Sequence, residues 1–149
     1  MSGAHAGSPG ENIAVLDFTS GTASSTPLQS AAVRFKDFGK MLFIANLGDM
    51  AAETIDFAVV ACNSGGTGDT TITGKAVTQL AANASANDNK QLVIAVDEAD
   101  LIASGLEYVQ AKITTGGATG GLASIVTLGT HFNGPASGVD ASSVVQIVP

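Results

Sequence analysis

Short apolar runs that repeat every second residue dominate the chain and predict β-strands. Between residues 54 and 62 this alternation places one set of apolar side chains on a single face. Residues 106–115 alternate more strictly and predict a strand with one face in water. The solvent-exposed face of this second strand would carry Tyr108, Gln110, Lys112 and Thr114.

Seven further segments are short, apolar and bounded by turn residues, and these are residues 13–18, 31–35, 41–47, 71–80, 91–97, 123–132 and 143–148. The glycine-rich segments 63–69 and 115–121 are predicted to be hairpin loops, because glycine adopts the positive φ angles that tight loops need. About nine strands at this spacing predict an all-β fold, an antiparallel β-sandwich or jelly roll.

One segment has a helical character. Asp97 can cap a short helix over residues 97–103, and Gly105 can end it, which predicts one short helical crossover. Two stretches, residues 19–26 and 83–89, are expected to be loosely held. The predicted organisation is a flexible N-terminal arm, residues 1–12, followed by a single β-sandwich domain, residues 13–149.

Charged residues are sparse and mostly acidic. They make up 13% of the 149 residues, about half the share of an average soluble domain, and the formal net charge is −7. The lysines are scattered, so direct binding to nucleic acid is not expected. The longest apolar run, residues 57–62, is far shorter than the ~20 residues of a membrane span. We therefore expect no membrane contact, and the first residues lack the pattern of a secretory signal.

No arrangement of residues indicates catalysis. Cys62 is the sole cysteine and is interpreted as a small buried core residue, because no motif ties His5 or His131 to it. The glycines before Lys75 lack the spacing of a phosphate-binding loop. We therefore expect no enzymatic activity and no cofactor.

The acidic and aromatic clusters have simple structural interpretations. The acidic residues within 97–100 are interpreted as a solvated, capped turn rather than a metal site. Asp88 is interpreted as part of an exposed loop, and no metal ligand is assigned. Phe35, Phe38 and Phe43 lie among basic residues and are interpreted as core side chains, with a binding face as the alternative.

A series of phrases occurs in order between residues 54 and 136: Gly74-Lys75-Ala76-Val77-Thr78-Gln79-Leu80, Asp88-Asn89-Lys90-Gln91-Leu92-Val93-Ile94, Asp100-Leu101, Gly105-Leu106-Glu107-Tyr108-Val109-Gln110-Ala111 and Phe132-Asn133-Gly134-Pro135-Ala136. Together they resemble a widespread family of small structural proteins of tailed bacteriophages, of the capsid decoration or cement type. The resemblance implies a β-sandwich subunit bound to the outside of the phage head, without enzymatic activity or cofactor.

The implied partner is the major capsid protein, whose subunit contacts the chain would stabilise from the outer surface of the virion. Few long charged side chains suit large contact surfaces, and the acidic balance suits a position away from packaged nucleic acid. Self-association into a trimer is preferred, with a dimer as the alternative. Two other functions stay open: a tail or tube component, and a carbohydrate-binding or host-adhesion module, which the absence of Trp and the single Tyr disfavour.

The candidate partner contacts lie towards the two ends of the chain. The apolar residues 144–149 would either close a sheet or pair with the edge strand of a neighbour. The arm would add further contacts that become ordered on binding. The candidate contact residues are His5, Pro9, His131, Phe132, Gln146 and Ile147.

Overall fold

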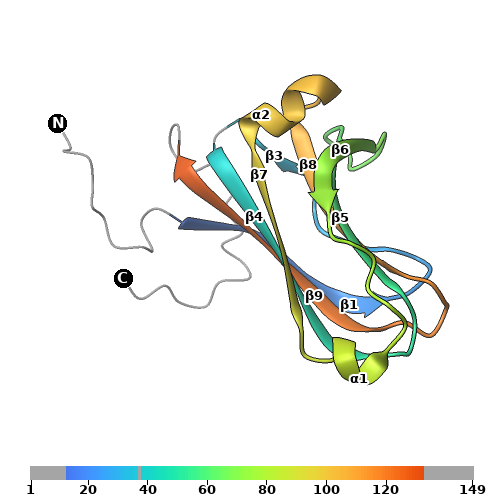
Figure 1. Ribbon diagram of the computed structural model, residues 1–149. Helices are drawn as coiled ribbons and strands as arrows, with labels where there is room; N and C mark the ends of the chain where they lie inside the picture. Colours follow the sequence, from blue (N-terminus) through green and yellow to red (C-terminus); the bar gives the residue numbers. More distant parts are fainter. Residues whose placement is uncertain (1–12, 37, 133–149) are drawn as a thin grey trace.

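The computed structural model describes residues 13–36 and 38–132. They form two antiparallel sheets that face each other (Figure 1), which confirms the predicted antiparallel β-sandwich. Sheet A has the strand order β1 (Ile13–Ala23), β9 (Gly121–Phe132), β4 (Phe38–Met50), β7 (Gln91–Asp97). Sheet B has the order β2 (Leu28–Gln29), β8 (Tyr108–Thr115), β5 (Ile55–Cys62), β6 (Thr70–Ala76), and β3 (Val33–Arg34) also pairs with β8.

The chain folds as one long hairpin that is wound into two layers. The turn between β5 and β6, which pair with each other, is the tip of this hairpin. Moving away from the tip along both arms, β4 pairs with β7, then β2 and β3 pair with β8, and finally β1 pairs with β9. Successive pairs belong alternately to sheet B and sheet A. The pairs β4–β9 and β5–β8 then join neighbouring hairpin arms within each sheet. This winding is that of a jelly roll.

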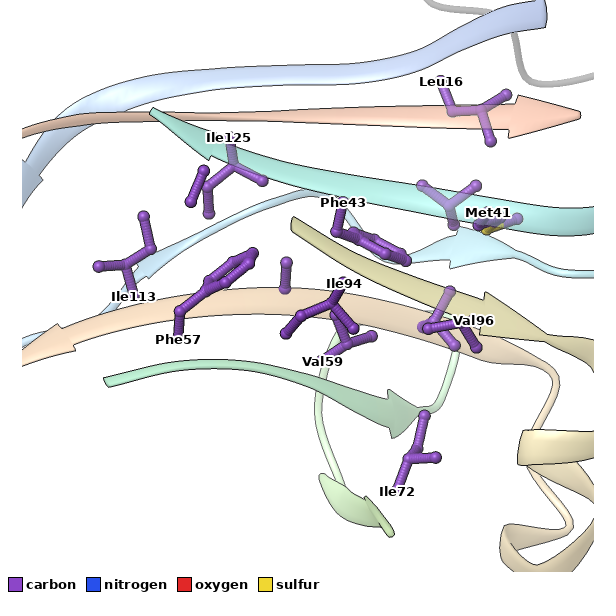
Figure 2. Packing of buried hydrophobic residues seen from close by; sticks show 14 of the residues in the cluster. Leu16, Met41, Phe43, Phe57, Val59, Ile72, Ile94, Val96, Ile113 and Ile125 are labelled. Carbon is purple, nitrogen blue, oxygen red and sulfur yellow. The ribbon is translucent and has the colours of Figure 1, made fainter. Parts of the chain in front are cut away.

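The hydrophobic core lies between the two sheets (Figure 2). Phe43 of β4 comes from sheet A, and Phe57 and Val59 of β5 come from sheet B; all three are at most 1% exposed. Phe35 and Phe38 are buried as well. The interpretation of the clustered phenylalanines as core residues is therefore confirmed.

The predicted helical crossover is present between β7 and β8. It consists of α2 (Glu98–Leu101) and the 3₁₀ helix η2 (Ile102–Ser104), and Gly105 ends it with a φ of 66°. The Asp100 carboxylate accepts a hydrogen bond from the backbone N–H of Asp97 at 2.7 Å. This bond satisfies a backbone donor that would otherwise have no partner at the start of the helix.

A second helix, α1 (Ala84–Asn87), lies between β6 and β7. The predictions of a single helix and of a loosely held segment 83–89 are therefore wrong. The Oδ1 atom of Asn83 accepts a hydrogen bond from the N–H of Ala86 at 3.2 Å, which caps the turn. Within the described part of the chain, no helix is long and apolar enough to cross a membrane.

Two loop predictions are also wrong. Strand β1 continues to Ala23 because it pairs with β9 along its whole length, so most of the segment 19–26 is strand. Residues 115–121 do not form a hairpin loop, since β8 belongs to sheet B and β9 to sheet A. The predicted hairpin at residues 63–69 is confirmed by the pairing of β5 with β6. The predicted arm, residues 1–12, and the predicted strand 143–148 lie outside the described residues.

Candidate interaction surface

The outer face of sheet A carries apolar side chains where one face of an antiparallel sheet is usually polar. On the central strand β4, Leu42 and Ile44 point away from the core, since Phe43 between them is fully buried. Leu42 lies opposite Leu128 of β9, and Ile44 lies opposite Val126. This part of sheet A is therefore apolar on both faces.

The register across all four strands extends these two pairs into complete apolar rows. One row runs from Val15 on β1 to Ala95 on β7, and the next runs from Phe18 to Val93. Phe18 is 47% exposed and Val93 is 55% exposed, and the other side chains of the two rows are half-buried. The described residues therefore leave these rows partly open to solvent. We name the two rows the apolar band, which consists of Val15, Phe18, Leu42, Ile44, Val93, Ala95, Val126 and Leu128.

A β-bulge in β1 brings Phe18 into the apolar band. The register shifts between Val15 and Asp17, and the extra residue, Leu16, is buried in the core. In a regular strand, residues three positions apart point to opposite faces, and the bulge restores Val15 and Phe18 to the same face. The Asp17 carboxylate accepts a hydrogen bond from the N–H of Ala31 at 3.0 Å, which ties the bulge to the segment beside it.

Two mostly polar rows border the apolar band. At one end the Nζ atom of Lys40 lies 3.6 Å from Oδ1 of Asp97. At the other end Asn46 donates a hydrogen bond to Ser124 at 3.3 Å and accepts one from Gln91 at 2.6 Å. The first row consists of Ile13, Thr130, Lys40 and Asp97, and the second of Ser20, Ser124, Asn46 and Gln91. An apolar centre with a hydrogen-bonding rim is the arrangement found at protein–protein interfaces.

The outer face of sheet A is hollowed beyond the second polar row. Gly21 and Gly48 contribute no side chain there, and the hollow has a volume of about 440 Å³. Leu122 lines it and is 62% exposed. A Cβ atom on Gly48 would lie only 3.1 Å from the Leu122 carbonyl oxygen, so glycine allows β4 and β9 to approach closely at this point.

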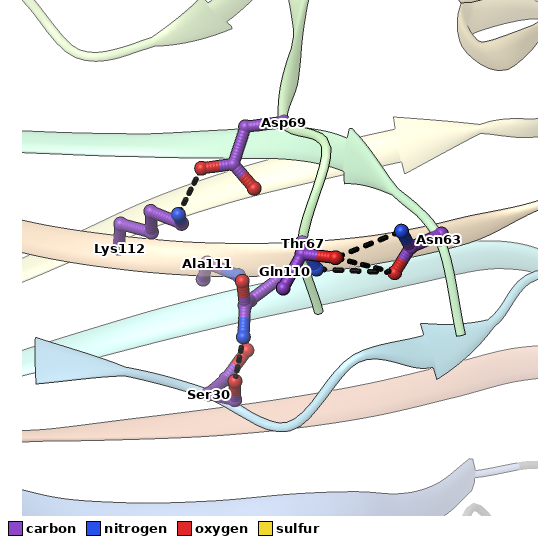
Figure 3. A network of polar contacts seen from close by, with 7 residues as sticks. All are labelled: Ser30, Asn63, Thr67, Asp69, Gln110, Ala111 and Lys112. Atoms are coloured by element: carbon purple, nitrogen blue, oxygen red, sulfur yellow. Dashed lines mark hydrogen bonds and ion pairs between the residues drawn. The ribbon is translucent and has the colours of Figure 1, made fainter. Parts of the chain in front are cut away.

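The outer face of sheet B carries a network of polar side chains, and other parts of the chain cover some of it (Figure 3). The prediction that Gln110 faces water is wrong: it is 6% exposed, and its Nε2 atom donates to the carbonyl of Ser30 at 2.7 Å. The loop 63–69 also approaches the Gln110 amide through Gly66. Lys112 forms an ion pair with Asp69 on the same face. The two sheets therefore present unlike outer surfaces.

Cys62, Lys75 and Asp100 take part in packing and ion pairing within the described chain. Burial raises the pKa of the Cys62 thiol, and the side chain is fully buried, which confirms its interpretation as a core residue. Lys75 lies in β6 with its Nζ atom 2.9 Å from Oδ2 of Asp100. Burial by itself would raise the pKa of Asp100, yet the N–H of Asp97 and the Lys75 ammonium hold it below its ordinary value. Among residues 13–36 and 38–132, no three His, Cys, Asp or Glu side chains gather to hold a metal ion.

Two of the six predicted contact residues lie within the described chain. His131 and Phe132 end β9, and the backbone of Phe132 lies opposite Phe38. The other four lie outside the described residues, and these are His5, Pro9, Gln146 and Ile147. The apolar band includes none of the six, although it begins at Leu128 on the same strand as His131.

The sequence does contain a signal for the apolar band. Residues 41–45 and 92–96 are uninterrupted apolar runs, and such runs are typical of strands that are covered on both faces. The alternation of apolar residues locates β4 and β7, but it does not show what covers the second face of these strands.

No protein-family model matches the sequence, and no curated protein matches it. Among solved structures, the chain is similar to the coat protein of Tobacco streak virus, with a TM-score of 0.38 and 13% sequence identity over 95% of this chain and 100% of that chain. A TM-score of this size does not establish a shared fold. The assignment of a jelly roll rests on the strand pairing.

Proposed function

We propose that the chain is a non-enzymatic structural protein of a virion, which binds the outside of a bacteriophage head and stabilises the contacts between major capsid protein subunits. The observation that carries the proposal is the apolar band on the outer face of sheet A. Eight apolar residues in two adjacent rows form a continuous surface. Contiguous exposed apolar surface with a polar rim marks a site of protein contact.

The distribution of charge supports the same role. A formal charge of −7 disfavours contact with packaged nucleic acid, so a position on the outer side of the shell is favoured. The ion pairs Arg34–Glu107, Lys75–Asp100 and Lys112–Asp69 tie together segments distant in sequence. These basic side chains are engaged within the subunit, which leaves few cations to attract an anionic ligand.

The alternative of a carbohydrate-binding module has less support. Sugar-binding platforms use exposed aromatic faces, and Phe18 is the one exposed aromatic side chain among those whose burial is described. Tyr108, the single tyrosine, is half-buried. A glycan array probed with the purified full chain would revive this alternative if it showed specific binding.

The proposal is tested with phage heads assembled without the chain. The purified full chain is added, and bound protein is measured by co-sedimentation together with the melting temperature of the heads. We expect saturable binding and a higher melting temperature than that of heads incubated with buffer alone. Absence of binding, or binding without stabilisation, would overturn the proposal.

Electron cryo-microscopy of the complete virion separates a head protein from a tail or tube component. We expect density for the jelly roll on the outer surface of the head, at contacts between capsid subunits. Density confined to the tail would assign the chain to the alternative. Density on the inner surface of the shell would also contradict the proposed location.

A further inference from the structure

We infer that the apolar band is a two-fold interface between two copies of this chain. The inference rests on the proposed role as a structural protein. It assigns the outer face of sheet A to a second copy, so that the pair of subunits would bind the head through its other surfaces. Three properties of this face favour a second copy: the order of its rows, the heights of its side chains and its charge. The order of the rows and their charge follow from the register of the four strands, and the heights follow from the exposure of the side chains.

The order of the rows is symmetric. Along the strands the face is polar at the row of Lys40, apolar at the rows of Leu42 and Ile44, and polar again at the row of Asn46. A two-fold axis that lies in the face between the two apolar rows exchanges apolar with apolar and polar with polar. A two-fold interface between identical copies must be self-complementary in this way. The polar row of Lys40 would then meet that of Asn46, whose amide can both donate and accept hydrogen bonds.

The extent to which the side chains protrude from the face is compatible with the same two-fold axis. Phe18 and Val93 stand at the two ends of one apolar row and are about half exposed, whereas Val15 and Ala95 at the ends of the other row are more buried. The axis places the protruding row of each copy over the recessed row of its partner. Two sheets packed in this manner interdigitate their side chains, as the two sheets of a sandwich core do.

The charge of the face also favours a second copy. Lys40 and Asp97 are its only charged residues in the four rows, and they form an ion pair at 3.6 Å. The face therefore has no net charge, although the whole chain has a charge of −7. Two acidic copies repel each other least when they meet through an uncharged surface. Contact through the apolar band thus avoids the repulsion that other surfaces would bring.

The area of the face is sufficient for a reversible dimer. Four strands about 4.8 Å apart and four rows about 6.8 Å apart cover roughly 500 Å² on each copy. Two such faces bury roughly 1,000 Å² together, which is at the lower limit for a specific interface. We therefore expect a dimer whose population depends on protein concentration.

The test measures the mass of the purified full chain in solution, without phage heads, by light scattering and sedimentation over a wide range of concentrations. We expect a monomer–dimer equilibrium. Phe18→Glu and Val93→Glu change exposed side chains at the two edges of the band and should each raise the dimer dissociation constant about 100-fold or more, because a charge enters the interface from both copies. Ile102→Glu is the matched control, since Ile102 is 77% exposed and lies in η2, outside the four strands of sheet A.

The possible results separate the occupants of the face. A wild-type chain that stays monomeric, a trimer, or a dimer that both edge variants retain would each overturn the inference. A monomer that dimerises only after removal of residues 133–149 would show that the chain itself covers the band. Circular dichroism of each variant establishes that it is folded. A monomeric chain that still binds heads would refute the interface alone, and a dimer that binds no heads would refute the proposed function alone.

Discussion

Asp88 and Met50 are joined by a hydrogen bond that orders a segment with the sequence character of a loop. The Oδ1 atom of Asp88 accepts the backbone N–H of Met50 at 2.8 Å. Two further backbone bonds, from Asn89 to the Gly48 carbonyl and from Leu47 to the Lys90 carbonyl, hold the same segment against the end of β4. The carboxylate of Asp88 is therefore used to support sheet A, at the end opposite to the Lys40–Asp97 pair.

Replacement of Asp88 tests this support. Asp88→Ala leaves the N–H of Met50 without its acceptor, and we expect a loss of about 1–3 kcal/mol in the free energy of unfolding. Asp88→Asn keeps an oxygen at the same position and should lose clearly less. Urea unfolding at one fixed protein concentration measures both variants. Equal losses would mean that the charge of Asp88, rather than its hydrogen bond, supports the fold.

Gly120 tests the crossing between the sheets. Its φ is 60°, and a Cβ atom there would overlap the carbonyl group of Ala23. We expect Gly120→Ala to cost about 3 kcal/mol or more, or to prevent folding, because strain and overlap add. The control is Gly65→Ala in the β5–β6 loop, where the added Cβ would make only an ordinary contact with Asn63. Similar thermal unfolding curves for the two variants would contradict this expectation.

Glu53 gives a prediction about pH. The Thr115 side chain, followed by the hydrogen bonds from the N–H groups of Gly120 and Thr119, holds the pKa of Glu53 below its ordinary value of 4.5. A carboxyl whose pKa is lowered by folding stabilises the protein above the ordinary pKa, and this contribution is lost as the pH falls through the lowered value.

We therefore expect Glu53→Gln to lower the melting temperature at neutral pH and the wild-type advantage to shrink as the pH falls below 4.5. Thermal unfolding between neutral and strongly acidic pH measures this difference. Glu98→Gln, which removes the same charge from an exposed position at the start of α2, is the control. A gap between Glu53→Gln and wild type that stays constant with pH would contradict the role of the ionised carboxylate.

Phe57 tests the core between the sheets. It is 1% exposed, and Phe57→Ala removes most of a ring that fills the space between sheet B and sheet A, which should cost about 3–5 kcal/mol. Ile102→Ala removes an exposed apolar side chain and should change the free energy of unfolding by no more than about 0.5 kcal/mol. Urea unfolding measures both. A loss of less than about 1 kcal/mol for Phe57→Ala would mean that the core can close around the missing ring.

The local sequence pattern correctly predicts those strands and helices whose bounds depend on neighbouring residues. Strand β7 has the bounds expected from residues 91–97, and Gly105 ends the helix that Asp97 begins, since period and caps are local properties. The crossing at 115–121 was predicted as a hairpin loop because a glycine-rich connection looks the same whether the next strand joins its neighbour or the opposite sheet. Pairing between strands distant in sequence determines which sheet the next strand joins, and the local sequence contains no signal for this pairing.

The candidate interaction surface is harder to predict from the sequence, because it too depends on pairing between distant strands. Composition indicated a contact surface, and the runs 41–45 and 92–96 contain half of the apolar band. Phe18 belongs to the apolar band only because of the β-bulge at Leu16. The alternation of apolar and polar residues in the sequence does not reveal this bulge. Gln110 illustrates the converse: alternation assigned its side correctly, but the burial comes from the segment at Ser30, which is far away in sequence.

The nested pairing of the strands also determines when sheet A can be completed during synthesis on the ribosome. Strand β9 lies between β1 and β4 and is the last strand of the described chain to emerge. Until it does, β1 has no neighbour in its own sheet, whereas β5 and β6 can pair early as a local hairpin. Pairing of Ile13 with Thr130 closes a loop of more than a hundred residues, and such long-range contacts form slowly. The complete apolar band therefore exists as a surface only once β9 has been made, so association of nascent chains through it before that point is avoided.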